Sequence, residues 1–418
     1  MQIRLAYGKS GLTVNFPDNV DVILPNFVAG LDDEASALRQ ALRNPLGAKS
    51  LHEIVTPEDD VVIVFPDRSR PMPSSIVLPA ILSELSHLPT DKITLLNALG
   101  VHRPNTQEEL TDMLGPDIVK NYRVLQHNAD DRDMLVNLGQ TSFGHEIWIN
   151  RIFLAAKVKV LTGFIEPHFF AGFSGGPKAV MPGISGIETI HGNHSAKMID
   201  NLSATWGETE ANPVYQEMAE VADRVAPEFV VNVTLNSRRE ITGIFAGNWR
   251  EVHRDGCAFV RQSAMRPVDE PYDVVVTSNA GFPLDANLYQ AVKGLSVAAR
   301  IVRQGGTIVI AAACTEGITH HENFYRLLRS QTSPDKLIRM MLESPETQRD
   351  QWQVQILANV LKKADVRIHS LLPEEAVRAC HMMKVNDIAL FLNEIRAKRP
   401  NCRIAVLPEG PETIPYIK

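Results

Sequence analysis

Residues 272–313 read YDVVVTSNAGFPLDANLYQAVKGLSVAARIVRQGGTIVIAAA. The stretch 273–281, with its run of valines, is typical of a strand, and the apolar spacing at 288–302 predicts a helix. A turn at Gly305 and Gly306 separates that helix from a second apolar run at 307–313. Strand, helix and strand in this order form a βαβ unit with an expected right-handed crossover, so we expect the two strands to be parallel neighbours.

Strands and helices alternate elsewhere in the chain as well. Further strands are predicted at 60–66, 92–99, 157–163 and 403–408, with a hairpin formed by 3–6 and 12–16. Helices are predicted at 33–43, 76–88, 187–199, 334–342, 352–363 and 388–398. Thr106 with Glu109, and Ser185 with Glu188, have the spacing of capping boxes that begin helices. We therefore expect an α/β protein with mostly parallel sheets flanked by helices.

A stretch with two prolines and mixed charge, at 262–271, predicts a domain boundary. We expect an N-terminal domain at 1–266 and a C-terminal α/β domain at 270–399. The last strand, within about 400–418, is expected to pack back onto the N-terminal domain.

The composition favours a globular protein that binds a small molecule. The chain has 418 residues, 44% hydrophobic and 22% charged, and a net charge of −7 without blocks of like charge. This balance argues against nucleic acid as a partner, and no apolar run is long enough for a membrane helix. The four cysteines form no C-x-x-C pair, which argues against a zinc knuckle or a disulfide scaffold and favours the cytoplasm.

The usual nucleotide motifs are missing. No two glycines are spaced at i and i+2, so the dinucleotide fingerprint G-x-G-x-x-G is absent. The stretch 172–178, GFSGGPK, resembles a phosphate-binding loop, but Pro177 removes an N–H donor and Ala179 stands where Ser or Thr would bind Mg²⁺.

Several polar residues follow predicted strands, where ligands bind in open α/β sheets. Asp67 and Arg70 follow the first parallel strand, where they form either a surface ion pair or an anion site. His102 follows the second strand, as a helix-entry residue or as a functional group. His168 follows the third strand.

The stretch 166–178, EPHFFAGFSGGPK, is rich in glycine and aromatic residues. Glycines there cost backbone entropy, so we expect Gly175 and Gly176 to let the backbone approach a ligand near Lys178. His191 and His194 are three residues apart on the predicted helix 187–199, and whether they bind a metal stays open without a third ligand. Other histidines show no partner pattern and are expected to be structural or solvated: His52, His87, His127, His145 and His253.

Tyr289, Gln290 and Lys293 share one face of the helix at 288–302. They are either ordinary exposed polar residues or a clamp for a carboxylate.

These motifs together resemble the nickel-pincer nucleotide-dependent lactate racemases. The resemblance rests on GFIEPHFFAGFSGGPKAVMPGISGIETIHGNHS at 163–195, Asp67-x-x-Arg70-Pro71, Gly100-Val-His102-Arg103 and Tyr289-Gln290-x-x-Lys293. It extends over most of the chain. It implies a two-domain enzyme whose active site lies in the interdomain cleft, with 1–266 as the cofactor and catalytic domain.

The resemblance also implies a cofactor and a role for each residue. The cofactor is nickel held by pyridinium-3,5-bisthiocarboxylic acid mononucleotide, the nickel-pincer nucleotide, joined covalently to Lys178. His194 is the implied nickel ligand, His102 and His168 are the acid–base pair, and Trp352 is an aromatic near the substrate. The implied cofactor-binding set is Lys178, His194, Asp67, Arg70, Gly175 and Gly176. The implied substrate-binding set is Arg70, Tyr289, Gln290, Lys293 and Trp352.

The expected reaction is racemisation of a short 2-hydroxy acid such as lactate. Removing the proton bonded to C2 of an ionised 2-hydroxy acid is very hard, whereas moving that hydrogen as hydride is easier if the hydroxyl proton leaves with it. Two histidines suit this scheme because each enantiomer places its hydroxyl on a different side. Enzymes that make the cofactor and insert nickel are the expected partners.

Three alternatives remain from the sequence. The chain is an epimerase or racemase of another 2-hydroxy acid, such as malate or a sugar acid, on the same cofactor. It is a metal-dependent hydrolase that uses His168, His191 and His194. It is a nickel-cofactor binder without catalysis.

Overall fold

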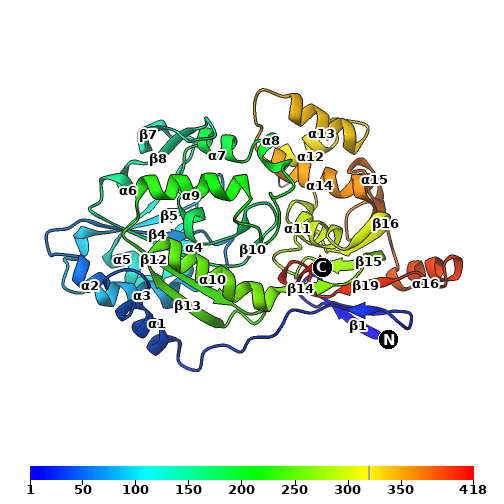
Figure 1. The fold of residues 1–418 in the computed structure, drawn as a ribbon, viewed down its shortest axis with the longest axis horizontal. Coiled ribbons are helices and arrows are strands. Elements are labelled where there is room, and N and C mark those ends of the chain that lie inside the picture. The colour runs from blue at the N-terminus through cyan, green and yellow to red at the C-terminus, as the bar shows by residue number, and fades with distance from the viewer. Residues whose placement is uncertain (319–320) are drawn as a thin grey trace. The chain divides into compact units, whose positions relative to one another are not determined.

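The computed structural model describes residues 1–318 and 321–418, in two compact units (Figure 1). The β4 unit contains Phe27–His194 and Asn201–Gln262, and the β15 unit contains Met1–Asn26, Ser195–Asp200 and Ser263–Lys418. Each is named after a strand inside its own six-stranded sheet. The predicted α/β fold class with parallel sheets is confirmed.

The sheet of the β4 unit has the strand order β13-β12-β9-β4-β5-β6. Every pair is parallel except β12 with β13, and β4 pairs with β5 from Val61↔Ile93 to Pro66↔Ala98. The strands carry apolar side chains on both faces of the sheet, and helices bury both faces. Figure 1 shows α1 and α3 on one side of β4 and β5 and α9 on the other, and α1, α3 and α4 contribute to the core under this sheet.

The elements of the β4 unit are, in chain order, α1 (Glu34–Arg43), α2 (Leu51–Ile54), β4 (Val61–Pro66), α3 (Ser74–Glu84), η1 (Thr90–Lys92), β5 (Ile93–Ala98), α4 (Gln107–Leu114), α5 (Pro116–Asn121), β6 (Arg123–Gln126), η2 (Arg132–Met134), β7 (Leu135–Gln140), β8 (Glu146–Asn150), α6 (Arg151–Ala155), β9 (Val158–Phe164), β10 (Pro167–His168), β11 (Gly172–Phe173), η3 (Gly176–Ala179), α7 (Ile187–Asn193), α9 (Pro213–Val225), β12 (Phe229–Leu235), β13 (Ile241–Gly247) and α10 (Trp249–Ala264).

The sheet of the β15 unit is parallel throughout, in the order β18-β17-β16-β15-β19-β3. Its βαβ unit is the one predicted at 272–313, with α11 packed against β15 and β16. A core of buried residues joins the β1–β2 hairpin and α16 to the strands β15, β16 and β19.

The elements of the β15 unit are β1 (Gln2–Leu5), β2 (Leu12–Asn15), β3 (Asp21–Val22), α8 (Ala196–Ile199), β14 (Met265–Val268), β15 (Tyr272–Ser278), α11 (Leu288–Ala299), β16 (Val302–Ala311), α12 (Glu322–Leu328), α13 (Pro334–Glu343), α14 (Gln351–Lys363), β17 (Ala364–His369), α15 (Glu374–Ala379), β18 (Met383–Lys384), α16 (Ile388–Lys398), β19 (Ile404–Leu407), η4 (Gly410–Glu412) and β20 (Ile414–Ile417).

The two ends of the chain belong to a different unit from the one predicted. Residues 1–26 were expected in the N-terminal domain and 400–418 were expected to pack onto it. Instead β19 pairs with β15 and β3, and β20 pairs with β14, so both ends lie in the β15 unit. Pairing with β15 buries Ile404 and Val406, and this apolar burial holds the last strands there.

Two local predictions also need correction. The capping box of Thr106 and Glu109 is present, but α7 is capped by Gly186 and not by Ser185. Ser185 is buried and its hydroxyl donates to the carbonyl of Val180 at 2.9 Å. The predicted turn at 305–306 lies inside β16, where the register with β15 shifts.

Candidate active site

The loops that follow β4, β5 and β9 lie at one edge of the sheet in the β4 unit. β4 lies between β5 and β9, and because all three are parallel their carboxyl ends share that edge. The next strands along the chain, β5 and β6, lie on one side of β4, and the later strand β9 lies on its other side. The carboxyl end of β4 is therefore a topological switch point, where α/β proteins typically bind ligands. The N–H of Gly100 donates to the carbonyl of Gly183 at 3.0 Å, so the loops after β5 and β9 are in direct contact.

His102 is held in place by Asp67. Its Nδ1 lies 2.7 Å from one carboxylate oxygen of Asp67, and the hydroxyl of Ser69 donates to the other at 2.7 Å. Burial raises the pKa of Asp67, but the hydrogen bond and charge of His102 and the charge of Arg70 outweigh it, so the pKa is lowered. An ionised carboxylate only accepts, which leaves the proton on Nδ1 of His102. Nε2 is then the ring nitrogen that exchanges a proton with a substrate.

Arg70 lies in the same loop as Asp67. Its backbone N–H donates to the carbonyl of Asp67 at 3.0 Å, and its charge contributes to the lowered pKa of that carboxyl group. The side chain is half-buried, and a guanidinium can bind a carboxylate or phosphate through two parallel hydrogen bonds.

His168, Lys178 and His194 gather around the ring of Phe170. The rings of His168 and His194 meet the Phe170 ring edge-on, with centroid distances of 4.7 and 5.0 Å. Lys178 Nζ lies 5.5 Å from the Phe170 centroid and 2.8 Å from Nε2 of His168. The structure therefore brings these three candidate residues together at the loop after β9.

The contact between Lys178 and His168 limits how many protons the pair can hold. At 2.8 Å, either the amine or the imidazole nitrogen has to accept the hydrogen bond. A lysine ammonium requires a lone pair on Nε2 of His168, whereas a protonated Nε2 requires a neutral amine. Either the Lys178 amine is neutral and can act as a nucleophile, or Nε2 of His168 has a lone pair and can act as a base.

His194 is buried at the end of α7, where its backbone N–H donates to the carbonyl of Ile190 at 2.8 Å. Burial, with smaller effects of Lys178 and His191, holds the pKa of His194 well below its ordinary value. The imidazole is therefore neutral, and a neutral imidazole is the form that binds a metal ion.

The predicted helix that carries His191 and His194 needs correction. The predicted helix 187–199 is interrupted, because α7 ends at Asn193 and α8 begins only at Ala196. His194 has φ −95° and ψ 20°, and Ser195 is extended with ψ 155°. His194 is thus the C-cap residue directly after α7, and its backbone N–H still bonds to the carbonyl of Ile190 four residues earlier.

Gly175 and Gly176 are required by packing within the protein. Their φ values are 76° and 49°, and a Cβ on Gly176 would lie 2.5 Å from the ring of His253. A Cβ on Gly175 would lie 2.7 Å from the side chain of Ile165. The N–H of Gly176 donates to Asn232 Oδ1 at 2.8 Å. Protein neighbours require glycine at both positions, which shape the loop that carries Lys178, and the ligand approach expected from the sequence stays a prediction.

The β15 unit contributes a second group of candidate residues, just after the carboxyl end of β15. Tyr289, Gln290 and Lys293 are half-buried on one face of α11. The side chain of Asn287 caps this helix by accepting a hydrogen bond from the N–H of Gln290 at 2.9 Å. β15 lies between β16 and β19, so this edge is a switch point of its own sheet.

Trp352 is near Tyr289. Its indole Nε1 donates to the Tyr289 hydroxyl at 3.4 Å. The ring of His321 stacks on Tyr289 with centroids 4.1 Å apart and an interplanar angle of 3°. These contacts orient the half-buried ring of Tyr289.

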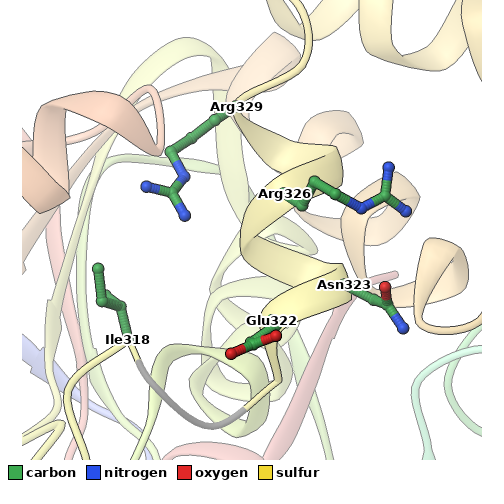
Figure 2. A pocket seen from close by; sticks show the side chains of 5 residues that line it. All are labelled: Ile318, Glu322, Asn323, Arg326 and Arg329. Atoms are coloured by element: carbon green, nitrogen blue, oxygen red, sulfur yellow. The ribbon is translucent and has the colours of Figure 1, made fainter.

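Figure 2 shows a pocket of about 410 Å³ in the β15 unit. Its walls come from α12 and the residues on either side of it, and Arg326 and Arg329 point to different sides. The polar side chains in it are exposed at the surface. The lining residues are Ile318, Glu322, Asn323, Arg326 and Arg329, so none of the candidate residues named above borders this pocket.

Two histidines that the sequence did not single out support the loops of the site. His253 Nε2 donates to the carbonyl of Ser174 at 3.1 Å, and His127 Nε2 donates to the carbonyl of Ser185 at 2.9 Å. Asn150 Nδ2 donates to the other nitrogen of His127 at 3.1 Å. Burial lowers the pKa of each of these histidines to about 4, so both are neutral. No spacing in the sequence indicates them, because their partners are distant along the chain.

The described ranges contain no three His, Cys, Asp or Glu side chains placed to hold a metal together. The hydrolase alternative needs such a group from His168, His191 and His194, so the structure does not favour it. No helix among the described residues is long and apolar enough to cross a membrane.

Comparison with known proteins identifies the family. Residues 7–207 match the lactate racemase N-terminal domain, and residues 268–414 match the lactate racemase C-terminal domain. The lactate racemase of Thermoanaerobacterium thermosaccharolyticum is 34% identical over 99% of this chain and 98% of its own length. The chain belongs to the lactate racemase family. The lactate racemase of Lactiplantibacillus plantarum is also 34% identical, over 98% of each chain.

Solved structures agree with this assignment. The lactate racemase apoprotein from T. thermosaccharolyticum matches with a TM-score of 0.92 and 33% identity, covering 99% of this chain and 100% of that chain. A protein from Thermotoga maritima matches with a TM-score of 0.69 and 18% identity, over 94% of this chain and 100% of that chain, and thus shares the fold. The resemblance inferred from the motifs is confirmed.

The buried neutral histidines predict how stability depends on pH. His253 has a folded pKa of about 4, against roughly 6.5 for an unfolded histidine. Its neutral form stabilises the fold above pH 6.5, and this contribution is lost as the pH falls from about 6.5 toward 4. We expect His253→Gln to flatten the pH dependence of the unfolding free energy in that window by up to about 1.4 kcal/mol per pH unit.

Chemical denaturation at several pH values measures this slope. His52 is exposed, so His52→Gln is the matched control and should leave the slope nearly unchanged. An unchanged slope in His253→Gln would show that this histidine is not held neutral by burial.

Proposed function

We propose that the chain is a racemase that interconverts D- and L-lactate. The observation that carries the proposal is the pair of imidazoles at one sheet edge, in a chain that is full-length similar to lactate racemases. His102 is fixed by Asp67, and His168 lies against Lys178. The racemisation of a 2-hydroxy acid needs two such groups because the two enantiomers present their hydroxyl to different sides of the site.

The two histidines handle the hydroxyl proton. His102 Nε2 removes that proton from one enantiomer and His168 removes it from the other. Each imidazole holds the proton while C2 of the substrate is planar and then returns it to oxygen. The Asp67 carboxylate stabilises the His102 imidazolium that forms in between, since it already accepts from Nδ1 at 2.7 Å.

Cationic and polar side chains bind the substrate carboxylate. We assign Arg70, Gln290 and Lys293 to this role, because a guanidinium, an amide and an ammonium all donate to carboxylate oxygens. Tyr289 and Trp352 line the site as aromatic residues. These anchors explain how a chain with a net charge of −7 binds an anion.

We propose the nickel-pincer nucleotide as the cofactor, joined covalently to Lys178 with His194 as a nickel ligand. The residues fit this group, because the His194 imidazole is neutral and the Lys178 amine faces a base at 2.8 Å. When bound, this cofactor supplies an acceptor for the C2 hydrogen together with its electron pair. In this proposal Asp67 and Arg70 also contact the cofactor. Other enzymes make the cofactor and insert the nickel. The chain works in the cytoplasm.

A second candidate function is the racemisation or epimerisation of another 2-hydroxy acid, such as malate or a sugar acid. The assigned groups recognise the carboxylate and the hydroxyl that all these acids share, and not the side chain that distinguishes them. The lactate racemase relatives favour lactate.

An assay of pure enantiomers tests the proposed function. The holoenzyme, produced together with the cofactor-assembly enzymes, should convert each lactate enantiomer into an equal mixture, as measured by chiral chromatography. Malate and sugar acids should react at least about tenfold more slowly, since a mismatched side chain costs roughly 1–3 kcal/mol in the site. Faster turnover of malate or a sugar acid would assign the chain to that substrate instead.

Removal of either imidazole should stop racemisation in both directions. His102→Ala and His168→Ala should each lower kcat by about 10²–10⁴-fold, because each removes one of the two acid–base groups. His52→Ala, at an exposed position of the same unit, is the control and should keep its kcat. A variant of His102 or His168 with full activity toward both enantiomers would refute the two-base scheme.

A further inference from the structure

Glu217 is a buried carboxylate that the proposed reaction does not use. It lies on α9 and is only 1% exposed. A buried carboxylate is unfavourable unless donors surround it. Three side chains donate to it: Thr141 Oγ1 at 2.6 Å, His145 Nδ1 at 2.8 Å and Asn193 Nδ2 at 2.9 Å.

These donors come from two different segments of the chain. Thr141 and His145 are in the turn between β7 and β8, and Asn193 is the last residue of α7. The same turn is fixed to α9 a second time, because the N–H of Ser142 donates to Glu220 at 2.8 Å. Figure 1 shows α7 next to the β7–β8 hairpin, and both α7 and the hairpin are bonded to α9 through Glu217.

The end of α7 is in close contact with this turn. A Cβ on Gly192 would lie 2.5 Å from the ring of His145, so the imidazole packs directly against the helix backbone. The amide of Asn193, fully buried, also donates to the carbonyl of Val214 on α9 at 3.0 Å. Both residues that precede His194 are therefore fixed, one by the turn and one by α9.

We infer that Glu217 is a positioning residue for His194. The carboxylate joins α9, the 141–145 turn and α7, and it thereby sets the backbone position from which the His194 imidazole reaches the nickel ion. This inference rests on the proposed role of His194 as a nickel ligand. Groups that orient a metal ligand typically change metal affinity by about 10–100-fold when they are removed.

Glu217→Gln is the informative variant. Glutamine has the same size, but its NH₂ group would face the Asn193 amide or another donor of the cluster. Asn193 cannot turn its oxygen to this NH₂ group without losing the hydrogen bond from the same nitrogen to Val214. One donor of the cluster therefore loses its acceptor on residue 217 with little change in volume, while the hydrogen bond from Asn193 to Val214 remains.

The experiment measures nickel loss from protein that carries the cofactor. Wild type, Glu217→Gln, Asn193→Ala and His194→Ala are produced with the cofactor-assembly enzymes, and intact mass reports the adduct on Lys178. Nickel remaining during incubation with EDTA is then measured by metal analysis. We expect Glu217→Gln and Asn193→Ala to carry the adduct and to lose nickel about 10–100-fold faster than wild type, approaching His194→Ala. The double variant should be no faster than the worse single variant, because both act through one contact.

Thr242→Val is the matched control. It removes the hydrogen bond of 2.8 Å between the buried hydroxyls of Thr234 and Thr242, on β12 and β13 of the same unit. This variant should lower the melting temperature and leave the rate of nickel loss within about twofold of wild type, so a general loss of stability is distinguished from a displaced His194. If Glu217→Gln does not fold, Asn193→Ala carries the test.

The outcomes separate the inference from the proposed function. Normal nickel retention in adduct-bearing Glu217→Gln and Asn193→Ala overturns the positioning role and leaves the proposed function intact. The absence of an adduct in wild type, or an adduct of the same added mass on Lys178→Ala, overturns the proposed cofactor attachment and the inference with it.

Discussion

The parallel pairing of β4 with β5 on one side and β9 on the other is the constraint on which the candidate site depends. It places three strand ends at one edge, so that loops distant in the sequence supply Asp67, His102 and His168 within one region. The strands hold this arrangement because they are apolar on both faces and covered by helices. The loops are then free to carry polar groups that a sheet interior would not tolerate.

Burial of neutral imidazoles is the second physical theme of the β4 unit. His127, His194 and His253 all lose their charge to desolvation. In His127 and His253 the neutral ring donates one hydrogen bond to a loop carbonyl, which fixes the loops around Lys178. In His194 the same effect leaves a lone pair for a metal ion. Desolvation thus serves loop geometry at two positions and, in the proposed function, metal binding at the third.

The sequence predicts much of this architecture, for reasons that particular residues make clear. Apolar runs such as 61–65 and 274–276 specify buried parallel strands, and the Thr106 and Glu109 capping box starts α4 as expected. Local patterns cannot show which sheet a short strand joins, so the place of 404–407 beside β15 was missed. They also miss contacts between distant residues, such as His145 with Glu217 or His253 with Ser174, because each partner has several plausible neighbours.

The account makes one central claim about chemistry: the imidazoles exchange the hydroxyl proton, and the hydrogen on C2 moves with its electron pair. The most direct measurement follows L-lactate that carries deuterium at C2, converted by the holoenzyme in ordinary water, with the D-lactate product analysed by mass spectrometry. The account predicts that deuterium is retained in the product. Replacement of the deuterium by hydrogen from water would contradict the account, since it would mean that an imidazole removes the C2 hydrogen as a proton that exchanges with solvent.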